Sequence, residues 1–267
     1  MKPLSFLNTD QEKRDIIAAG TAAGIGSAFG APIGGVLFTL EETSSFWDSA
    51  MTLRVVFCSL MATFFFNVMV AHDDLDSQVL VALGKFDNFS VQLVEVPIFI
   101  IIGILGGVLG AAFVKLHLRI EIFRRRFITP KSYLRVLEAI SISIFMAVGH
   151  FLLLYFDPSC HPHSEHLLGE GMKLFCPEGQ FSSASYITVG TAEHGLKQLL
   201  HGDPGSFPYP ILTAYTIFWF FTTCWATGLI CPGGILIPGL LIGAGWGRMI
   251  GRVVIAIFPQ HVSFSIL

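Results

Sequence analysis

The sequence predicts an all-α, multi-pass integral membrane protein, and three observations support this prediction. Of the 267 residues, 53% are hydrophobic and only 13% are charged, whereas about 25% of the residues of an average soluble domain are charged. Apolar stretches of roughly 20 residues, the length that an α-helix needs to cross a bilayer, recur along the chain. The 27 Gly and 25 Phe suit closely packed membrane helices. The formal net charge of −3 gives no reason to expect a nucleic-acid partner.

Six apolar stretches are expected to enter the lipid bilayer. The first is rich in Gly and Ala and contains Pro32, and the sixth follows a loop with Pro and two Gly. Proline removes a backbone hydrogen bond and glycine tolerates the resulting break, so we expect both stretches to contain discontinuous helices. The expected spans are residues 16–40, 50–71, 97–118, 136–156, 208–230 and 235–258.

A basic connection at residues 119–135 sets the orientation of the spans. Cytoplasmic connections carry an excess of Lys and Arg, so this one is expected to be cytoplasmic. Residues 72–96 and 157–207 then form loops on the opposite, luminal side. Glu41 and Glu42 come to lie near the cytoplasmic surface, where they avoid the cost of about 3 kcal/mol for a charge at the bilayer centre. The basic residues of the connection are Arg119, Arg124, Arg125, Arg126, Lys131 and Arg135.

The luminal segments contain an expected disulfide and a sequence that matches an N-glycosylation acceptor. Cys160 and Cys176 lie in a compartment where disulfides form, and we expect them to pair. Asn88, in the sequence Asn-Phe-Ser, is an N-glycosylation acceptor on the same side. Three histidines near Cys160 raise the alternative of a metal site, but their spacing favours a solvated loop. These histidines are His161, His163 and His166.

Two interruptions rich in Gly and Pro concentrate the candidate chemistry. "GAPIGG" at residues 30–35 predicts a break between two helices. "CPGGILIPGLLIGAGWGR" at residues 231–248 predicts an unwound stretch, followed by a helix that starts between Ile235 and Pro238. A helix that starts inside a membrane directs about half a positive charge and several free N–H groups at whatever precedes it, which suits a small anion. The alternative interpretation is a structural kink.

Two stretches resemble the CLC family of chloride channels and chloride/proton exchangers. They are "AAGIGSAFGAPIGGVLFTLEETSSFW" and "GGILIPGLLIGAGWGR", and the second is similar to the family's G-x-F-x-P chloride motif, with Leu236 in place of Phe. "LEETSSFW", "KFDNF" and the paired cysteines are most similar to the lysosomal and late-endosomal exchanger branch. The motif residues are Gly234, Ile235, Leu236, Ile237 and Pro238.

The resemblance implies specific roles and partners. The amides of Ile235 and Leu236 would line the central chloride site, and Glu42 would be the internal proton-transfer glutamate, with Glu41 as a structural neighbour. Chloride and protons would be the transported ions, and no other cofactor is expected within these residues. The family also implies a homodimer, with part of its interface around residues 33–70, and this branch implies an accessory single-span subunit and a lysosomal or late-endosomal membrane.

The family's plan of two inverted halves implies the organisation of the chain. Residues 1–71 would be the end of the first half and residues 97–267 most of the second. The external gating glutamate is expected before residue 1, and the chloride-coordinating tyrosine and nucleotide-binding CBS pair after residue 267, so we expect an internal fragment. The alternatives to an exchanger are a passive chloride channel and a truncated, non-transporting interaction or regulatory subunit. No Ser/His/Asp set or metal-ligand spacing within a span indicates an enzyme.

Overall fold

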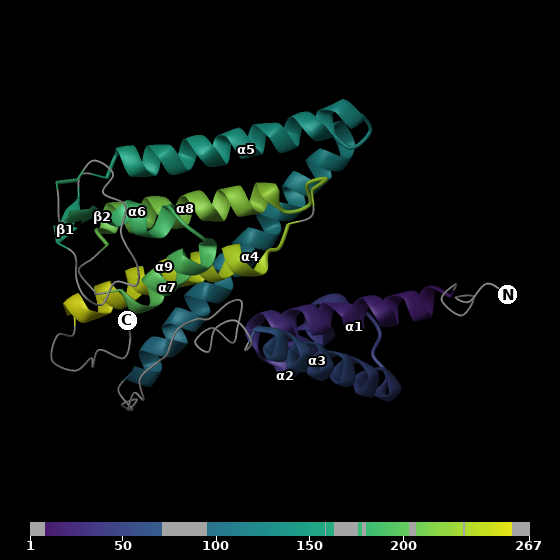
Figure 1. Ribbon diagram of the computed structural model, residues 1–267. Coiled ribbons are helices and arrows are strands. Elements are labelled where there is room, and N and C mark those ends of the chain that lie inside the picture. Colours follow the sequence, from purple (N-terminus) through teal and green to yellow (C-terminus); the bar gives the residue numbers. More distant parts are fainter. Residues whose placement is uncertain are drawn as a thin grey trace. The chain divides into compact units, whose positions relative to one another are not determined.

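The computed structural model describes residues 9–70, 95–157, 159–162, 176–177, 180–202, 207–231 and 233–257. The chain divides into two compact units, Met1–Ala82 and Leu83–Leu267. Most of the described residues are helical (Figure 1). The predicted all-α class is therefore confirmed, with one short pair of strands added in the second unit.

The first unit contains the first predicted helix break. Helix α1 (Asp10–Phe29) ends at Gly30, whose φ of 62° lies in the left-handed region that glycine adopts without strain. Helix α2 (Pro32–Phe38) then begins at Pro32, where the missing N–H costs no hydrogen bond. A π-helical turn, η2 (Thr39–Thr43), follows, and helix α3 (Ser49–Val70) completes the unit.

Glycines let the three helices of the first unit approach closely. A Cβ atom on Gly35 of α2 would lie 2.7 Å from the backbone nitrogen of Gly26 in α1. From α3, the buried Ser59 hydroxyl donates a shared hydrogen bond to the carbonyl oxygens of Ala22 (3.1 Å) and Pro32 (2.9 Å). Ser59 thereby fixes α3 against both sides of the break. The buried apolar residues of this unit are Ala18, Ala22, Val36, Met51 and Val55.

Two long helices open the second unit. Helix α4 (Val96–Phe127) has 32 residues and is about 48 Å long at 1.5 Å per residue, longer than the roughly 30 Å hydrocarbon core of a bilayer. Helix α5 (Ser132–Tyr155) follows after four residues. The predicted basic connection of residues 119–135 is therefore mostly helical, because both helices continue beyond their apolar segments.

The segment predicted as a luminal loop, residues 157–207, contains regular structure. Strands β1 (Cys160–Pro162) and β2 (Gln180–Ser182) pair in antiparallel register, with Cys160 opposite Ser182. Two short helices follow, α6 (Ser183–Thr188) and α7 (Ala192–His201). Both helices contribute buried residues to the core of the second unit, so this segment is part of the packed fold.

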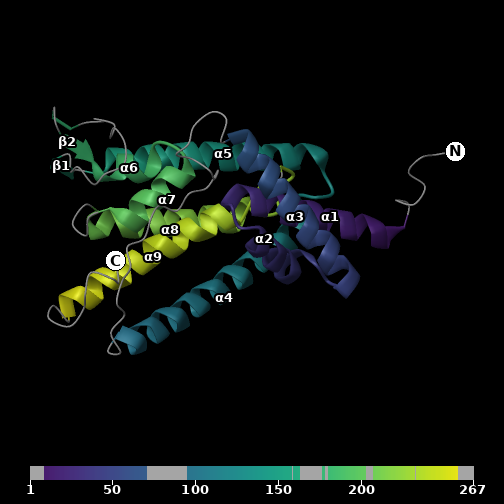
Figure 2. The same ribbon diagram turned by 60° about the horizontal axis from the view of Figure 1, so that its bottom comes forward.

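The last two helices pack beside each other in both views of the second unit (Figures 1 and 2). Helix α8 (Tyr209–Ala226) and helix α9 (Leu236–Ile257) meet where Gly245 leaves room for the Thr216 hydroxyl. On another face of α8, Gly149 of α5 leaves room for the ring of Phe218. The core comprises Ala184, Tyr186, Ile187, Leu196, Leu199, Phe207, Ile211, Leu212, Tyr215 and Leu241.

Four of the described helices are long and apolar enough to cross a membrane: α3, α4, α5 and residues Leu236–Ala256 of α9. Two of the six predicted spans do not meet these criteria. The first, residues 16–40, is divided by the break, and α1 begins with several charged residues. The other, residues 208–230, forms the 18-residue α8, whose sequence includes four threonines.

Candidate anion and proton site

The second predicted break lies between α8 and α9. Gly228, two residues beyond the end of α8, has a φ of 82°, and α9 begins at Leu236, within the interval predicted for the helix start. The Gly239 N–H donates to the Ile235 carbonyl at 2.9 Å, which is the first bond of the α9 ladder. The N–H groups from Ile235 to Ile237 precede this ladder, and Pro238 has no N–H.

These N–H groups lie at the positive end of the α9 dipole. Gly233, Gly234 and Ile235 are exposed in the chain, and a Cβ atom on either glycine would meet nothing within 4 Å. A small anion can therefore approach the backbone directly. The helix terminus and its N–H groups favour negative charge without any side-chain cation.

A cavity of about 370 Å³ adjoins the start of α9. It is lined by Phe113 of α4, Thr223 of α8 and, from the α9 side, Ile235, Gly243 and Trp246, among others. The last turn of α8 and the residue preceding α9 thus face the same space. Its walls are mostly apolar, and the polar groups of its lining residues include the Thr223 hydroxyl and the Trp246 indole N–H as well as the backbone of Ile235.

Glu41 and Glu42 lie in the π-helical turn of the first unit. Thr39 accepts a hydrogen bond from the Ser44 N–H at 3.1 Å, a separation of five residues, and another from the Thr43 hydroxyl at 2.8 Å. Both glutamates are exposed in the chain. The turn closes the α2 segment, since the next residue, Ser44, is extended, with φ of −103° and ψ of 116°.

A charged cavity of about 530 Å³ begins at the residue after Glu42. Thr43 and Trp47 line one part of it, and α1 and α3 line the rest. Arg54 of α3 is 3.9 Å from carboxylate oxygens of both Glu12 and Asp15 of α1. The cavity therefore offers a polar environment next to the glutamate pair. Its charged lining residues are Glu12, Arg14, Asp15, Asp48 and Arg54.

Arg124, which the sequence places in the basic connection, belongs to a buried polar cluster. Arg124 is 5% exposed, and its Nε donates to the Glu138 carboxylate at 3.1 Å. Its Nη1 donates to Glu121 at 3.2 Å and to the Thr227 carbonyl at 2.9 Å, and its Nη2 donates to the Trp225 carbonyl at 2.6 Å. Glu138, a carboxylate near the start of a mostly apolar helix, is the sequence feature that could have indicated this cluster.

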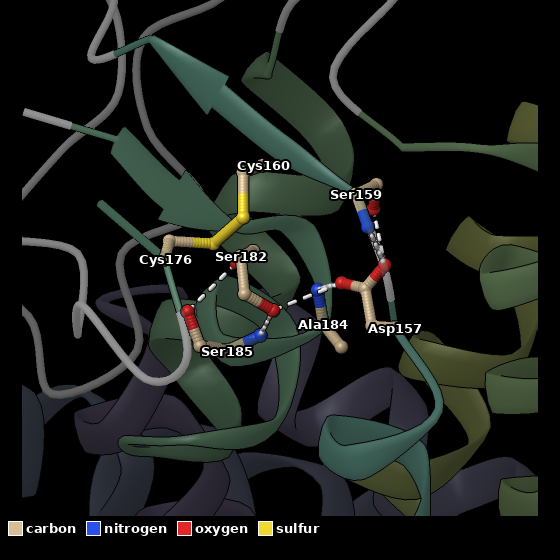
Figure 3. Close-up of a disulfide and its surroundings, with 7 residues drawn as sticks. All are labelled: Asp157, Ser159, Cys160, Cys176, Ser182, Ala184 and Ser185. Atoms are coloured by element: carbon tan, nitrogen blue, oxygen red, sulfur yellow. Dashed lines mark hydrogen bonds between the residues drawn. A yellow bond between two sulfur atoms is a disulfide. The ribbon is translucent and has the colours of Figure 1, made fainter.

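Cys160 and Cys176 are joined by a disulfide bond with their Cα atoms 5.8 Å apart (Figure 3). Beside it, the buried Asp157 carboxylate accepts bonds from the Ala184 N–H at 2.7 Å and the Ser182 hydroxyl at 2.9 Å. It also accepts a bond from the Ser159 N–H at 3.0 Å. Asp157 therefore attaches the end of α5 to the start of α6.

The remaining predicted sites have different outcomes. Asn88, His163 and His166 lie outside the described residues. Within the described part of the chain, no group of three or more His, Cys, Asp or Glu side chains is arranged to hold a metal ion. Glu42 lies in the first unit and residues 234–238 lie in the second, so each predicted site is described within its own unit.

The fold and the broken helices define a multi-pass α-helical membrane protein with an anion-attracting helix terminus. Residues 3–267 match the voltage gated chloride channel family, and the chain belongs to this family. It is 39% identical over 257 residues to H(+)/Cl(-) exchange transporter 7 of Homo sapiens, covering 94% of this chain and 32% of that protein. It is also 32% identical over 266 residues to chloride channel protein C of Dictyostelium discoideum, covering 94% of this chain and 35% of that protein. The chain thus spans about a third of the length of these relatives.

Proposed function

We propose that this chain forms part of a chloride/proton antiporter of an intracellular organelle membrane. The observation that carries the proposal is the start of α9 at Leu236, directly after an unwound stretch that contains exposed glycines. Its free N–H groups would bind chloride through the backbone. Such a site binds an anion weakly enough for release, which conduction also requires.

Glu42 is the residue that we assign to proton transfer. Glu42 belongs to the stretch "LEETSSFW", which is similar to the exchanger branch of the family, and it lies in the π-helical turn η2. The charged cavity begins at the next residue, Thr43. The cavity would give water and protons a route from the cytoplasmic side to this carboxylate. Glu41 is the adjacent carboxylate and is assigned a structural role.

The likeness to H(+)/Cl(-) exchange transporter 7, at 39% identity, favours exchange over passive conduction, whereas chloride channel protein C, at 32% identity, is named as a channel. H(+)/Cl(-) exchange transporter 7 is named for its exchange of protons and chloride, and the mouse and human proteins match this chain equally well, at 39% identity. By the same likeness we propose a lysosomal or late-endosomal membrane, a homodimer with part of its interface around residues 33–70, and an accessory single-span subunit.

The test uses the full-length gene product reconstituted into liposomes. An imposed chloride gradient is expected to drive protons against their own gradient in the wild-type protein. Glu42→Ala should abolish this proton movement while chloride flux continues, because chloride binding relies on the second unit. Proton movement is followed with a pH-sensitive dye and chloride efflux with an ion-selective electrode.

Glu41→Ala is the matched control, since it removes the neighbouring carboxylate from the same turn. Proton coupling should survive this change. Chloride flux without proton movement in the wild-type protein would identify a passive channel and refute the exchange proposal. Absence of flux from a folded wild-type protein would favour a non-transporting interaction or regulatory subunit.

A further inference from the structure

We propose that Arg124 is a positioning residue for the anion site, because it fixes the chain that connects α8 to the start of α9. The proposal rests on the assigned anion site and adds the group that holds its backbone in place. Arg124 itself belongs to α4 and has two carbonyl acceptors at the end of α8, at 2.6 Å and 2.9 Å.

The end of α8 shows why an external partner is needed. The last four carbonyl groups of an α-helix have no partner within the helix. Two of them are satisfied locally: Thr223 accepts bonds from the N–H (3.0 Å) and hydroxyl (2.7 Å) of Thr227, and Ala226 accepts from the Leu229 N–H at 3.3 Å. The carbonyls of Cys224 and Trp225 remain, and these point to α4.

Helix α4 supplies partners for both remaining carbonyl groups. His117 Nδ1 is 3.3 Å from the Cys224 carbonyl oxygen, and two turns later along the same face Arg124 donates to Trp225. Arg124 also donates to Thr227, the first residue of the unwound stretch. A single guanidinium therefore holds the helix end and the beginning of the connection together.

The position of Gly228 shows how closely the connection approaches Arg124. Its φ of 82° suits glycine, and a Cβ atom there would lie 2.9 Å from Arg124 Nη1 and 3.2 Å from a Glu121 carboxylate oxygen. Glu138 accepts from Arg124 Nε and keeps the guanidinium oriented. The turn and the Arg124 side chain are thus packed against each other.

The same contacts have an electrostatic consequence for an anion at α9. A helix C-terminus carries about half a negative charge, and the α8 terminus faces the cavity that Ile235 also lines. Arg124 offsets this negative charge together with the charges of Glu121 and Glu138, so removing Arg124 would leave the surroundings of the α8 terminus more negative. Loss of Arg124 should therefore both loosen the connection and make the anion site less favourable.

The experiment measures chloride binding to the purified full-length protein by isothermal titration calorimetry. Arg124→Gln is expected to raise the Kd for chloride by about tenfold. Arg124→Lys retains the charge but loses the planar fork that reaches several acceptors, so its Kd should fall between those of Arg124→Gln and wild type. In liposomes, Arg124→Gln should raise the KM for chloride more than it lowers the maximal rate.

Arg125→Gln is the matched control, because Arg125 is the next residue of α4, its side chain is 77% exposed and it pairs with Glu121 at 2.8 Å. It should leave the Kd for chloride unchanged. Folded Arg124→Gln protein with the wild-type Kd and KM would overturn the proposal. If Arg124→Gln does not fold, Gly228→Ala decides, since it displaces the same turn without removing charge; a wild-type Kd in that variant would also overturn it.

The two proposals can fail separately. A wild-type protein that binds chloride but does not couple it to protons would refute exchange, while the comparison between Arg124→Gln and Arg125→Gln would still test positioning. A normal proton coupling with an unchanged Kd in Arg124→Gln would refute positioning alone.

Discussion

In the second unit, single buried charged side chains form hydrogen bonds with backbone groups at the ends of α7 and α8 and at the start of α6. Arg124 does so for α8, and Arg248 of α9 does so for α7, donating to the Leu199 carbonyl at 2.7 Å and to the Gly202 carbonyl. The Arg248 guanidinium also lies 4.9 Å from the centre of the Phe207 ring. Asp157 provides the converse arrangement, a carboxylate at the start of α6. Arg124, Arg248 and Asp157 are thus buried charges that lie where helix termini leave polar groups unsatisfied.

Asp157→Asn should destabilise the protein by about 1–3 kcal/mol, because the amide has only one oxygen for the hydroxyl and N–H donors that now share two. Thermal unfolding of the purified protein in detergent would register the change. Asp48→Asn is the control: Asp48 is exposed and accepts from the Ser49 N–H at 2.7 Å, and asparagine serves equally well at a helix start. Equal unfolding temperatures for both variants would contradict this role of Asp157.

At the scale of elements, the helix breaks were the most predictable features and the helix ends the least. Gly30 and Pro32 impose a break through their own backbone chemistry, so the sequence indicated it directly. The end of α4 and the start of α5 contain charged residues that also favour helix, so hydropathy alone placed the end of α4 too early, at residue 118, and the start of α5 too late, at residue 136. Helix α7 was missed because ten residues are too short for a span, although the spacing of its buried Leu196 and Leu199 is helical.

Gly35→Ala should separate α2 from α1 and destabilise the first unit, because its Cβ would overlap the Ala22 carbonyl oxygen and approach the Gly26 nitrogen to 2.7 Å. Both obstacles are backbone atoms, which cannot rotate away. Gly24→Ala in α1 is the matched control, since its Cβ would meet nothing within 4 Å. That variant should be neutral or stabilising by up to about 1 kcal/mol, as alanine favours helix. Thermal unfolding distinguishes the two, and equal effects would refute the close approach.

At the scale of the whole molecule, the class of protein and its family motifs could be read from composition and from two short stretches. The buried cluster around Arg124 could not, because its partners are distant in sequence: Glu138 lies 14 residues away and Trp225 lies 101 residues away. Only packing brings them together. Positive charge in a connection therefore predicted its side of the membrane but not the contacts of the individual arginines.

Cys160→Ser should lower the stability of the protein by about 3 kcal/mol, the chain-entropy estimate for a loop of roughly this length. The disulfide closes a sequence separation of 16 residues within the segment that also contributes α6 and α7 to the core. Reductant should lower the unfolding temperature of the wild-type protein but not that of Cys160→Ser. Cys58→Ser, at an exposed free cysteine, should retain the wild-type response to reductant.

The π-helical turn has a consequence for the angular register of the glutamates. Thr39 pairs with Ser44, five residues on, where an α-helix would pair it with the fourth residue. The turn therefore accommodates one extra residue, and each residue of an α-helix turns the chain by about 100°. Deleting Leu40 would restore α-helical spacing and advance Glu42 into the position that Glu41 now holds relative to α2. The phase of this one turn thus determines which of two adjacent carboxylates faces a given direction.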